Sequence, residues 1–257
     1  MNILFISGQP YPYGMASSKR IRLFAEYLGI NNQVQVMICA SNNARNNNEG
    51  NLKNVSWEFK IFSKIDYLFN YKGIYALLKG KYILGESNII CLYDGISLKN
   101  IFFAIIGKKL GYYIFTDIVE DYRFSSEKGS VFRRLLLYAD RLIERRGMNF
   151  VDGIIVISKK LLNKYNNNKY NNRIIHIPIS SENYNMNFKR IENDKFTFLY
   201  SGTFGKKDGV SFLIDAFKKL SINYNYIKLI LSGIISRPIN LQIKDYDRID
   251  YVGLIDD

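Results

Sequence analysis

Short apolar runs alternate along the chain with longer stretches in which apolar residues recur every three or four positions. The first pattern is typical of buried strands and the second of amphipathic helices. The runs predict strands near residues 2–7, 34–39, 55–62, 87–93, 112–117, 153–157 and 173–177. The spaced patterns predict a helix that begins after Ser17 or Ser18, and others near 66–80, 96–110, 130–148 and 158–165. Continuous apolar strands that alternate with helices indicate a parallel sheet covered on both faces.

The alternation is interrupted once. Residues 181–194 are polar and show no periodicity, which predicts a linker, and the Asn-rich residues 42–51 predict a loop. After the linker the pattern resumes with strands near 196–201, 226–231 and 249–252 and a helix near 209–220. The expected fold class is therefore α/β: a Rossmann-like parallel-sheet domain over residues 1–180, and the start of a second Rossmann-like domain over 195–257. Because such a domain usually needs about 120–200 residues, we expect the second one to be incomplete.

The charge balance points to anionic partners. Lysine and arginine number 36 against 23 aspartates and glutamates, for a net charge of +13. Such a charge suits nucleic acid, anionic lipid or phosphorylated substrates. No nucleic-acid-binding module is recognisable and the cations are dispersed, so we expect no nucleic acid. No apolar stretch reaches the roughly 18–20 residues of a membrane span, and we expect a cytoplasmic protein, at most attached to the inner face of the membrane.

The composition argues against a metal site and against disulfide bonds. There is one histidine, His176, and the two cysteines, Cys39 and Cys91, lie inside apolar runs. We therefore expect no metal site and no disulfide scaffold.

The segment Val131–Met148 predicts a strongly basic helix with five arginines beside an apolar face. One interpretation is a helix that lies against an anionic membrane surface. The other, more common among surface helices, is that its apolar face packs on the sheet.

Ligands of such folds bind at the carboxyl ends of the strands, so the residues that follow each strand are the candidates for function. The first strand leads into Gly14, two serines, Lys19 and Arg20 at a helix start, which is either an anion cradle or an ordinary capped loop. It is not the G-x-G-x-x-G fingerprint of dinucleotide-binding proteins.

Two later segments also carry polar groups at strand ends. After the strand near 112–117 come Asp117, Glu120 and Asp121, whose carboxylates either accept hydrogen bonds from sugar hydroxyls or cap the next helix. In the second domain, Gly202 ends a strand, and Lys206 and Lys207 follow, placed to meet a diphosphate as point charges.

The order and spacing of four segments resemble bacterial glycosyltransferases of the family-4 type, which have the two-domain GT-B fold. The segments are the first strand with its loop through Gly14 into Arg20, and residues Thr116–Tyr122, Val151–Leu162 and Gly202–Phe217. The resemblance implies hexosyl transfer from a nucleotide-sugar to a cell-surface glycan or lipid-linked acceptor, with retention of anomeric configuration and without a metal or cofactor.

The same resemblance assigns roles to residues. Asp117 and Glu120 would be catalytic groups on the acceptor side. Gly14 would lie near the donor phosphate or the acceptor, and Gly202, Lys206 and Lys207 would meet the diphosphate.

Three features depart from the family pattern. Thr203 replaces the usual arginine after the donor-domain glycine, and the interdomain Pro-Asn-Gly is absent. The Glu-x7-Glu motif is also missing, since the last glutamate is Glu192. We therefore expect a fragment with impaired activity. The alternative is a non-catalytic Rossmann-like binding module.

Overall fold

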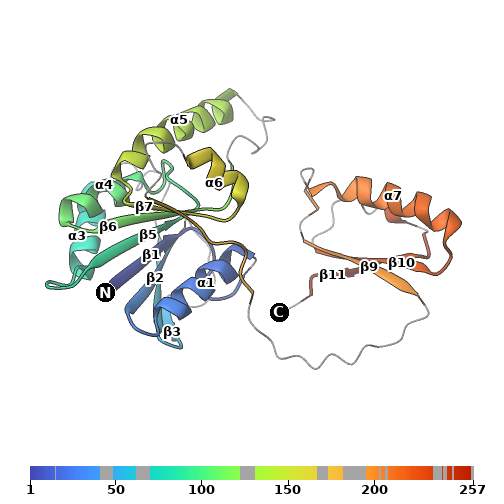
Figure 1. Cartoon of the computed structure of the whole chain (residues 1–257), viewed down its shortest axis with the longest axis horizontal. Helices are drawn as coiled ribbons and strands as arrows, with labels where there is room; N and C mark the ends of the chain where they lie inside the picture. Colours follow the sequence, from blue (N-terminus) through green and yellow to red (C-terminus); the bar gives the residue numbers. More distant parts are fainter. Residues whose placement is uncertain are drawn as a thin grey trace. The chain divides into compact units, whose positions relative to one another are not determined.

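The computed structural model describes residues 1–14, 16–40, 49–61, 70–121, 131–166, 173–181, 195–202, 204–205, 208–233, 239, 242–244 and 246–255. The chain divides into two compact units, Met1–Tyr184 and Asn185–Asp257. Each unit is a layered α/β structure (Figure 1), and the predicted α/β class is confirmed.

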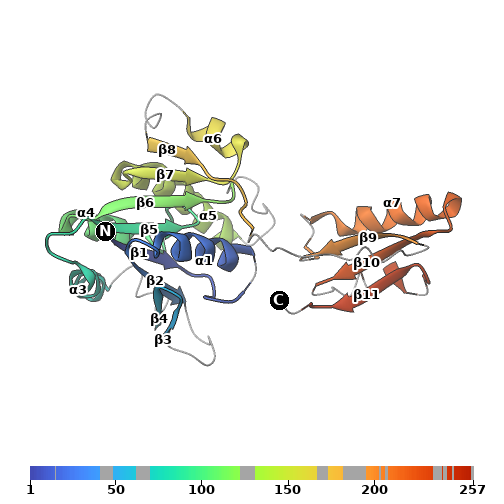
Figure 2. The ribbon, with the colours of Figure 1, turned by 60° about the horizontal axis from the view of Figure 1, so that its bottom comes forward.

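The first unit is built on one eight-stranded sheet. Its strands are β1 (Asn2–Ser7), β2 (Gln33–Ala40), β3 (Glu49–Leu52), β4 (Val55–Ile61), β5 (Asn88–Tyr93), β6 (Tyr113–Ile118), β7 (Gly153–Val156) and β8 (Ile174–His176). They lie in the order β3-β4-β2-β1-β5-β6-β7-β8 (Figure 2), and all neighbours pair in parallel except β3 and β4. The predicted Rossmann-like sheet is therefore present, with β1 at its centre.

The edge strand β3 corrects one prediction, because Glu49 to Asn51 were assigned to a loop. Its four residues are mostly polar, so no apolar run marks them. The strand exists because it pairs with β4 in antiparallel register. Gly50 allows this close pairing, since a Cβ there would lie 2.8 Å from the indole ring of Trp57.

Helices cover both faces of this sheet. The helix α1 (Ala16–Leu28) packs Ile21 and Ala25 on the face that carries Ile3 and Phe5 of β1. The opposite face is covered by α3 (Tyr71–Lys81), α4 (Ile101–Leu110), α5 (Val131–Gly147) and the short α6 (Lys159–Tyr165), as Figure 1 shows. Leu4 and Ile6 of β1 face that side, as the alternation of side chains along a strand requires.

The start of α4 lies five residues later than the predicted 96. The Asn100 side chain explains the difference, because it holds the preceding residues in a turn. Its Oδ1 accepts a hydrogen bond from the backbone N–H of Ser97 at 2.7 Å, and its Nδ2 donates to the carbonyl of Gly95 at 2.6 Å.

A glycine inside α3 offers a stabilising substitution. A Cβ at Gly80 would meet no atom within 4 Å, so Gly80→Ala should raise the free energy of unfolding of the first unit by about 0.5–1 kcal/mol. Urea unfolding followed by fluorescence of Trp57, the chain's single tryptophan, measures this unit. The control is Gly107→Ala in α4, where a Cβ would lie 2.7 Å from Ile90 Cδ1 and should destabilise. Equal shifts in both variants would contradict the packing described.

The second unit has a three-stranded parallel sheet in the order β11-β10-β9. Its elements are β9 (Phe196–Ser201), α7 (Val210–Asn223), β10 (Ile227–Ser232) and β11 (Ile249–Gly253). Ile214 and Phe217 of α7 pack on Leu229 and Leu231 of β10. This strand-helix-strand arrangement is Rossmann-like.

Candidate functional site

The first candidate region is the carboxyl edge of the first-unit sheet beside β1. The chain leaves β1 toward β2 on one side and later returns to place β5 on the other, so the direction of winding reverses there. In open parallel sheets this reversal opens a crevice outside the carboxyl ends of the strands. The loop after Ser7 and the turn at Asp94 and Gly95 both emerge at this edge.

Gly14 lies exposed at this edge, directly before the start of α1. A Cβ at Gly14 would lie 2.4 Å from Ser18 Oγ, so glycine is required where the loop passes over the helix start. Ser17 Oγ donates to Gln9 Oε1 at 3.1 Å, and the N–H of Gln9 donates to Ser7 Oγ at 2.9 Å. These bonds hold the loop against the helix; the role of Gly14 in donor binding stays a prediction.

Arg20 lies inside the domain and not in an open anion cradle. Its Nε and one terminal nitrogen donate to the two carboxylate oxygens of Asp117, at 2.8 and 3.0 Å. The guanidinium also donates to the carbonyls of Ile177 and Pro178, at 3.1 and 3.0 Å, and lies 4.5 Å from the ring centre of Phe24. Arg20 therefore connects α1, the end of β6 and the segment that follows β8.

The same contacts define the environment of Asp117, which is only 2% exposed. Burial raises the pKa of its carboxyl, and the Arg20 guanidinium opposes that rise. Both oxygens accept hydrogen bonds from Arg20, so the pair ties the end of β6 to α1. The catalytic role of Asp117 stays a prediction.

The three neighbouring acids thus have three different environments. Glu120 is exposed at the carboxyl edge. Asp121 accepts a charged hydrogen bond from Lys164 Nζ at 3.1 Å. Of the three, Glu120 is the carboxylate that presents its side chain to solvent, which is what a hydrogen bond to a sugar hydroxyl needs.

The second candidate region is the carboxyl edge of the second-unit sheet. Gly202 and Gly233 follow the ends of β9 and β10, and Gly253 ends β11. The N–H of Gly202 donates to the carbonyl of Ser232 at 3.0 Å, and that of Gly233 donates to the carbonyl of Gly253 at 2.8 Å. Three glycines therefore keep side chains away from this edge, where a ligand is able to approach the backbone closely. Thr203, Lys206 and Lys207 lie outside the described residues.

Sequence reasoning identified Gly202 but missed Gly233 and Gly253. A signal was present for Gly233, because Ser-Gly follows an apolar run at Ser7-Gly8, Ser201-Gly202 and Ser232-Gly233. In the structure all three pairs lie at the carboxyl ends of parallel strands.

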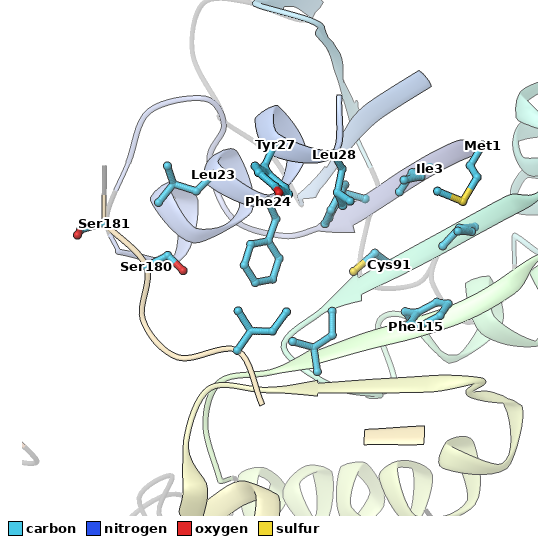
Figure 3. Close-up of a pocket in the computed structure, with 14 residues that line it drawn as sticks. Met1, Ile3, Leu23, Phe24, Tyr27, Leu28, Cys91, Phe115, Ser180 and Ser181 are labelled. Atoms are coloured by element: carbon cyan, nitrogen blue, oxygen red, sulfur yellow. The ribbon is translucent and has the colours of Figure 1, made fainter. Parts of the chain in front are cut away.

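An apolar groove lies along the face of the first-unit sheet beside α1 (Figure 3). Its volume is about 610 Å³. Leu23, Phe24 and Leu28 of α1 form one wall, and Cys91 and Phe115 form part of the floor. None of its lining side chains is charged, so no lining side chain supplies a cation for a phosphate.

Among the described residues, no group of three or more histidine, cysteine, aspartate or glutamate side chains is arranged to hold a metal ion. None of the described helices is both long enough and apolar enough to cross a bilayer.

Comparison with known proteins places the fold. No family model and no curated protein matches the chain, but solved structures do. Sucrose-phosphate synthase from Thermosynechococcus elongatus is 16% identical with a TM-score of 0.68, over 100% of this chain and 71% of that one. The lipopolysaccharide outer core galactosyltransferase WaaB is 14% identical with a TM-score of 0.61, over 99% and 68%.

A third structure, UDP-GlcNAc 2-epimerase from Methanocaldococcus jannaschii, is 10% identical with a TM-score of 0.55, over 100% of this chain and 74% of that one. At these identities the likeness concerns the fold alone. It confirms the predicted GT-B architecture, with two Rossmann-like units.

Proposed function

We propose that this chain is a nucleotide-sugar-dependent glycosyltransferase of the GT-B type. The observation that carries the proposal is the likeness over the whole chain, across both units, to a sucrose-phosphate synthase and a galactosyltransferase. The transfer proposed is of a hexosyl group to a glycan or lipid-linked acceptor, with retention of anomeric configuration. It needs no metal and no cofactor besides the nucleotide-sugar.

The donor is proposed to bind at the glycine-lined edge of the second unit. Gly202, Gly233 and Gly253 place no side chain at this edge, so none would block the approach of a diphosphate. Lys206 and Lys207 follow in the sequence, and their charge would offset the negative charge that develops on the departing nucleoside diphosphate.

The acceptor is proposed to bind at the carboxyl edge of the first unit. Glu120 is the exposed carboxylate able to accept a hydrogen bond from an acceptor hydroxyl. Gly14 is exposed at the same edge, and the Arg20–Asp117 pair holds the end of β6, which Glu120 follows.

Calorimetry with a panel of nucleotide-sugars tests donor binding. We expect weak, salt-sensitive binding, because exposed lysine contacts contribute only about 0–1 kcal/mol each. Lys207→Ala should weaken it further, whereas Lys219→Ala, at an exposed position of α7, should not. Micromolar or tighter binding that survives high salt would mean that other residues build the donor site.

The reaction itself is identified by its products. Release of nucleoside diphosphate that depends on an added acceptor supports transfer. Conversion of UDP-GlcNAc to its 2-epimer without an acceptor would instead favour epimerase chemistry, which one fold neighbour is named for. Binding without either product would favour a non-catalytic module.

A further inference from the structure

The helices α3, α4 and α5 form one layer over the sheet face opposite α1 (Figure 1). Exposed cations are spread over the outer surface of this layer. They are Lys72 and Lys79 of α3, Lys99 just before α4, Lys109 of α4, and Arg141, Arg145 and Arg146 of α5. We call the outer surface of these three helices the cationic helix face.

The carboxylates of this layer do not neutralise the cationic helix face. Asp140 is half-buried and its Oδ1 accepts a hydrogen bond from the N–H of Leu98 at 2.9 Å. Glu144 is half-buried and accepts a hydrogen bond from the Tyr165 hydroxyl. Within the described side chains of α3, α4 and α5, no carboxylate is exposed.

Apolar side chains lie among the cations. Tyr138 is 61% exposed and Leu142 is 40% exposed, one turn apart on α5 beside Arg141 and Arg145. The apolar face predicted for this helix is therefore partly open to solvent at Leu142. On α3, Tyr71 and Tyr75 are also exposed.

These side chains suit the headgroup region of a bilayer. Tyrosine places a ring in the apolar boundary and its hydroxyl in water, and leucine inserts below it. Lysine and arginine side chains extend from such a surface to the phosphate groups of the lipids. We propose that the cationic helix face binds an anionic phospholipid bilayer, independently of the proposed catalytic function.

Two features favour a bilayer over nucleic acid or a soluble phosphate. Single-stranded nucleic acid binds by stacking bases on open aromatic rings. Over α3 the Lys109 ammonium of α4 lies 5.6 Å from the ring centre of Tyr71, and that of Lys79 lies 6.0 Å from the ring centre of Tyr75. A base that stacked on either of these two rings would have to displace a lysine. The cations are also distributed over three helices and do not converge on one point, which matches a charged surface and not a single anion.

Co-sedimentation of the full chain with vesicles is the test. We expect binding to phosphatidylcholine vesicles that contain phosphatidylglycerol, weakened by salt, and little binding to phosphatidylcholine alone. Changing Arg141, Arg145 and Arg146 together to glutamine should weaken binding roughly a hundredfold. The control changes Lys195, Lys219 and Lys244, exposed in the second unit, to glutamine, with the same loss of charge. It should change binding by no more than a few fold.

The apolar contribution is tested with Tyr138→Gln and Leu142→Gln together, against Phe212→Gln on the exposed side of α7. The α5 pair should weaken the binding that persists at high salt, and the control should not. Trp57 fluorescence during urea unfolding confirms that the first-unit variants are folded, and circular dichroism does so for the second-unit controls. The comparison of vesicle types on the unaltered chain stands without any variant.

Four results would overturn the proposal. They are equal binding to both vesicle types, equal losses in the arginine variant and its lysine control, displacement of the protein from vesicles by single-stranded RNA, and displacement by glycerol phosphate. The third would indicate a nucleic-acid surface and the fourth a site for soluble phosphate.

Discussion

Replacing Arg20 by methionine should lower the free energy of unfolding of the first unit by about 3–5 kcal/mol. The substitution leaves the Asp117 carboxylate buried at 2% exposure without its cation. It also removes the donors that satisfy the carbonyls of Ile177 and Pro178. A buried charge left without a partner is costly, because the interior cannot solvate it as water does.

Urea unfolding followed by Trp57 fluorescence measures this change, since Trp57 lies in β4 of the same unit. The matched control is Lys53→Met, which removes an ion pair with Glu26 from a lysine that is 66% exposed. We expect that variant to cost only about 0–1 kcal/mol. If Arg20→Met costs no more than Lys53→Met, the buried pair does not hold the unit together.

A double variant separates the charge from the packing. Arg20→Met with Asp117→Leu removes both charges, so it should cost less than the sum of the two single substitutions. Additive losses would mean that the two side chains act independently, against the bidentate geometry.

The contact between Arg20 and Asp117 could not be predicted from the sequence. Arg20 and Asp117 are 97 residues apart, and only the placement of α1 beside the sheet brings them together. In the sequence, Asp117, Glu120 and Asp121 are three similar acids within five positions. Their different burial depends on where β6 ends at Ile118, which periodicity locates only within a residue or two.

The elements that the sequence predicts well are those whose pattern is caused by burial. The run at residues 2–7 gives β1, and helical spacing from Ile21 to Leu28 gives α1, because each buries an apolar face. The edge strand β3 was not predicted, because backbone pairing with β4, and not side-chain burial, produces it. At the second-unit edge, Gly202 was predicted because two lysines follow it, whereas Gly233 ends the same Ser-Gly pattern without a lysine beside it and was missed.

Gly233→Ala should destabilise the second unit by about 2–4 kcal/mol and weaken nucleotide-sugar binding. A Cβ at Gly233 would lie 1.9 Å from the carbonyl oxygen of Gly202, a backbone atom that cannot rotate away. The backbone at Gly233 also has φ of +139°, which L side chains rarely adopt. Overpacking and backbone strain therefore add, and the ends of β9 and β10 must separate to admit the methyl group.

Hydrogen exchange of the second-unit amides measures this effect. The N–H groups of Gly202 and Gly233, which donate to the carbonyls of Ser232 and Gly253, should exchange faster in the variant. The control is Gly253→Ala, where φ is +78° but a Cβ would meet no atom within 4 Å. It should show the strain of about 1–2 kcal/mol without the clash. Equal exchange in the two variants would mean that the close approach of β9 and β10 is not maintained in solution. If Gly233→Ala weakens nucleotide-sugar binding more than Gly253→Ala does, donor binding depends on the spacing between the ends of β9 and β10.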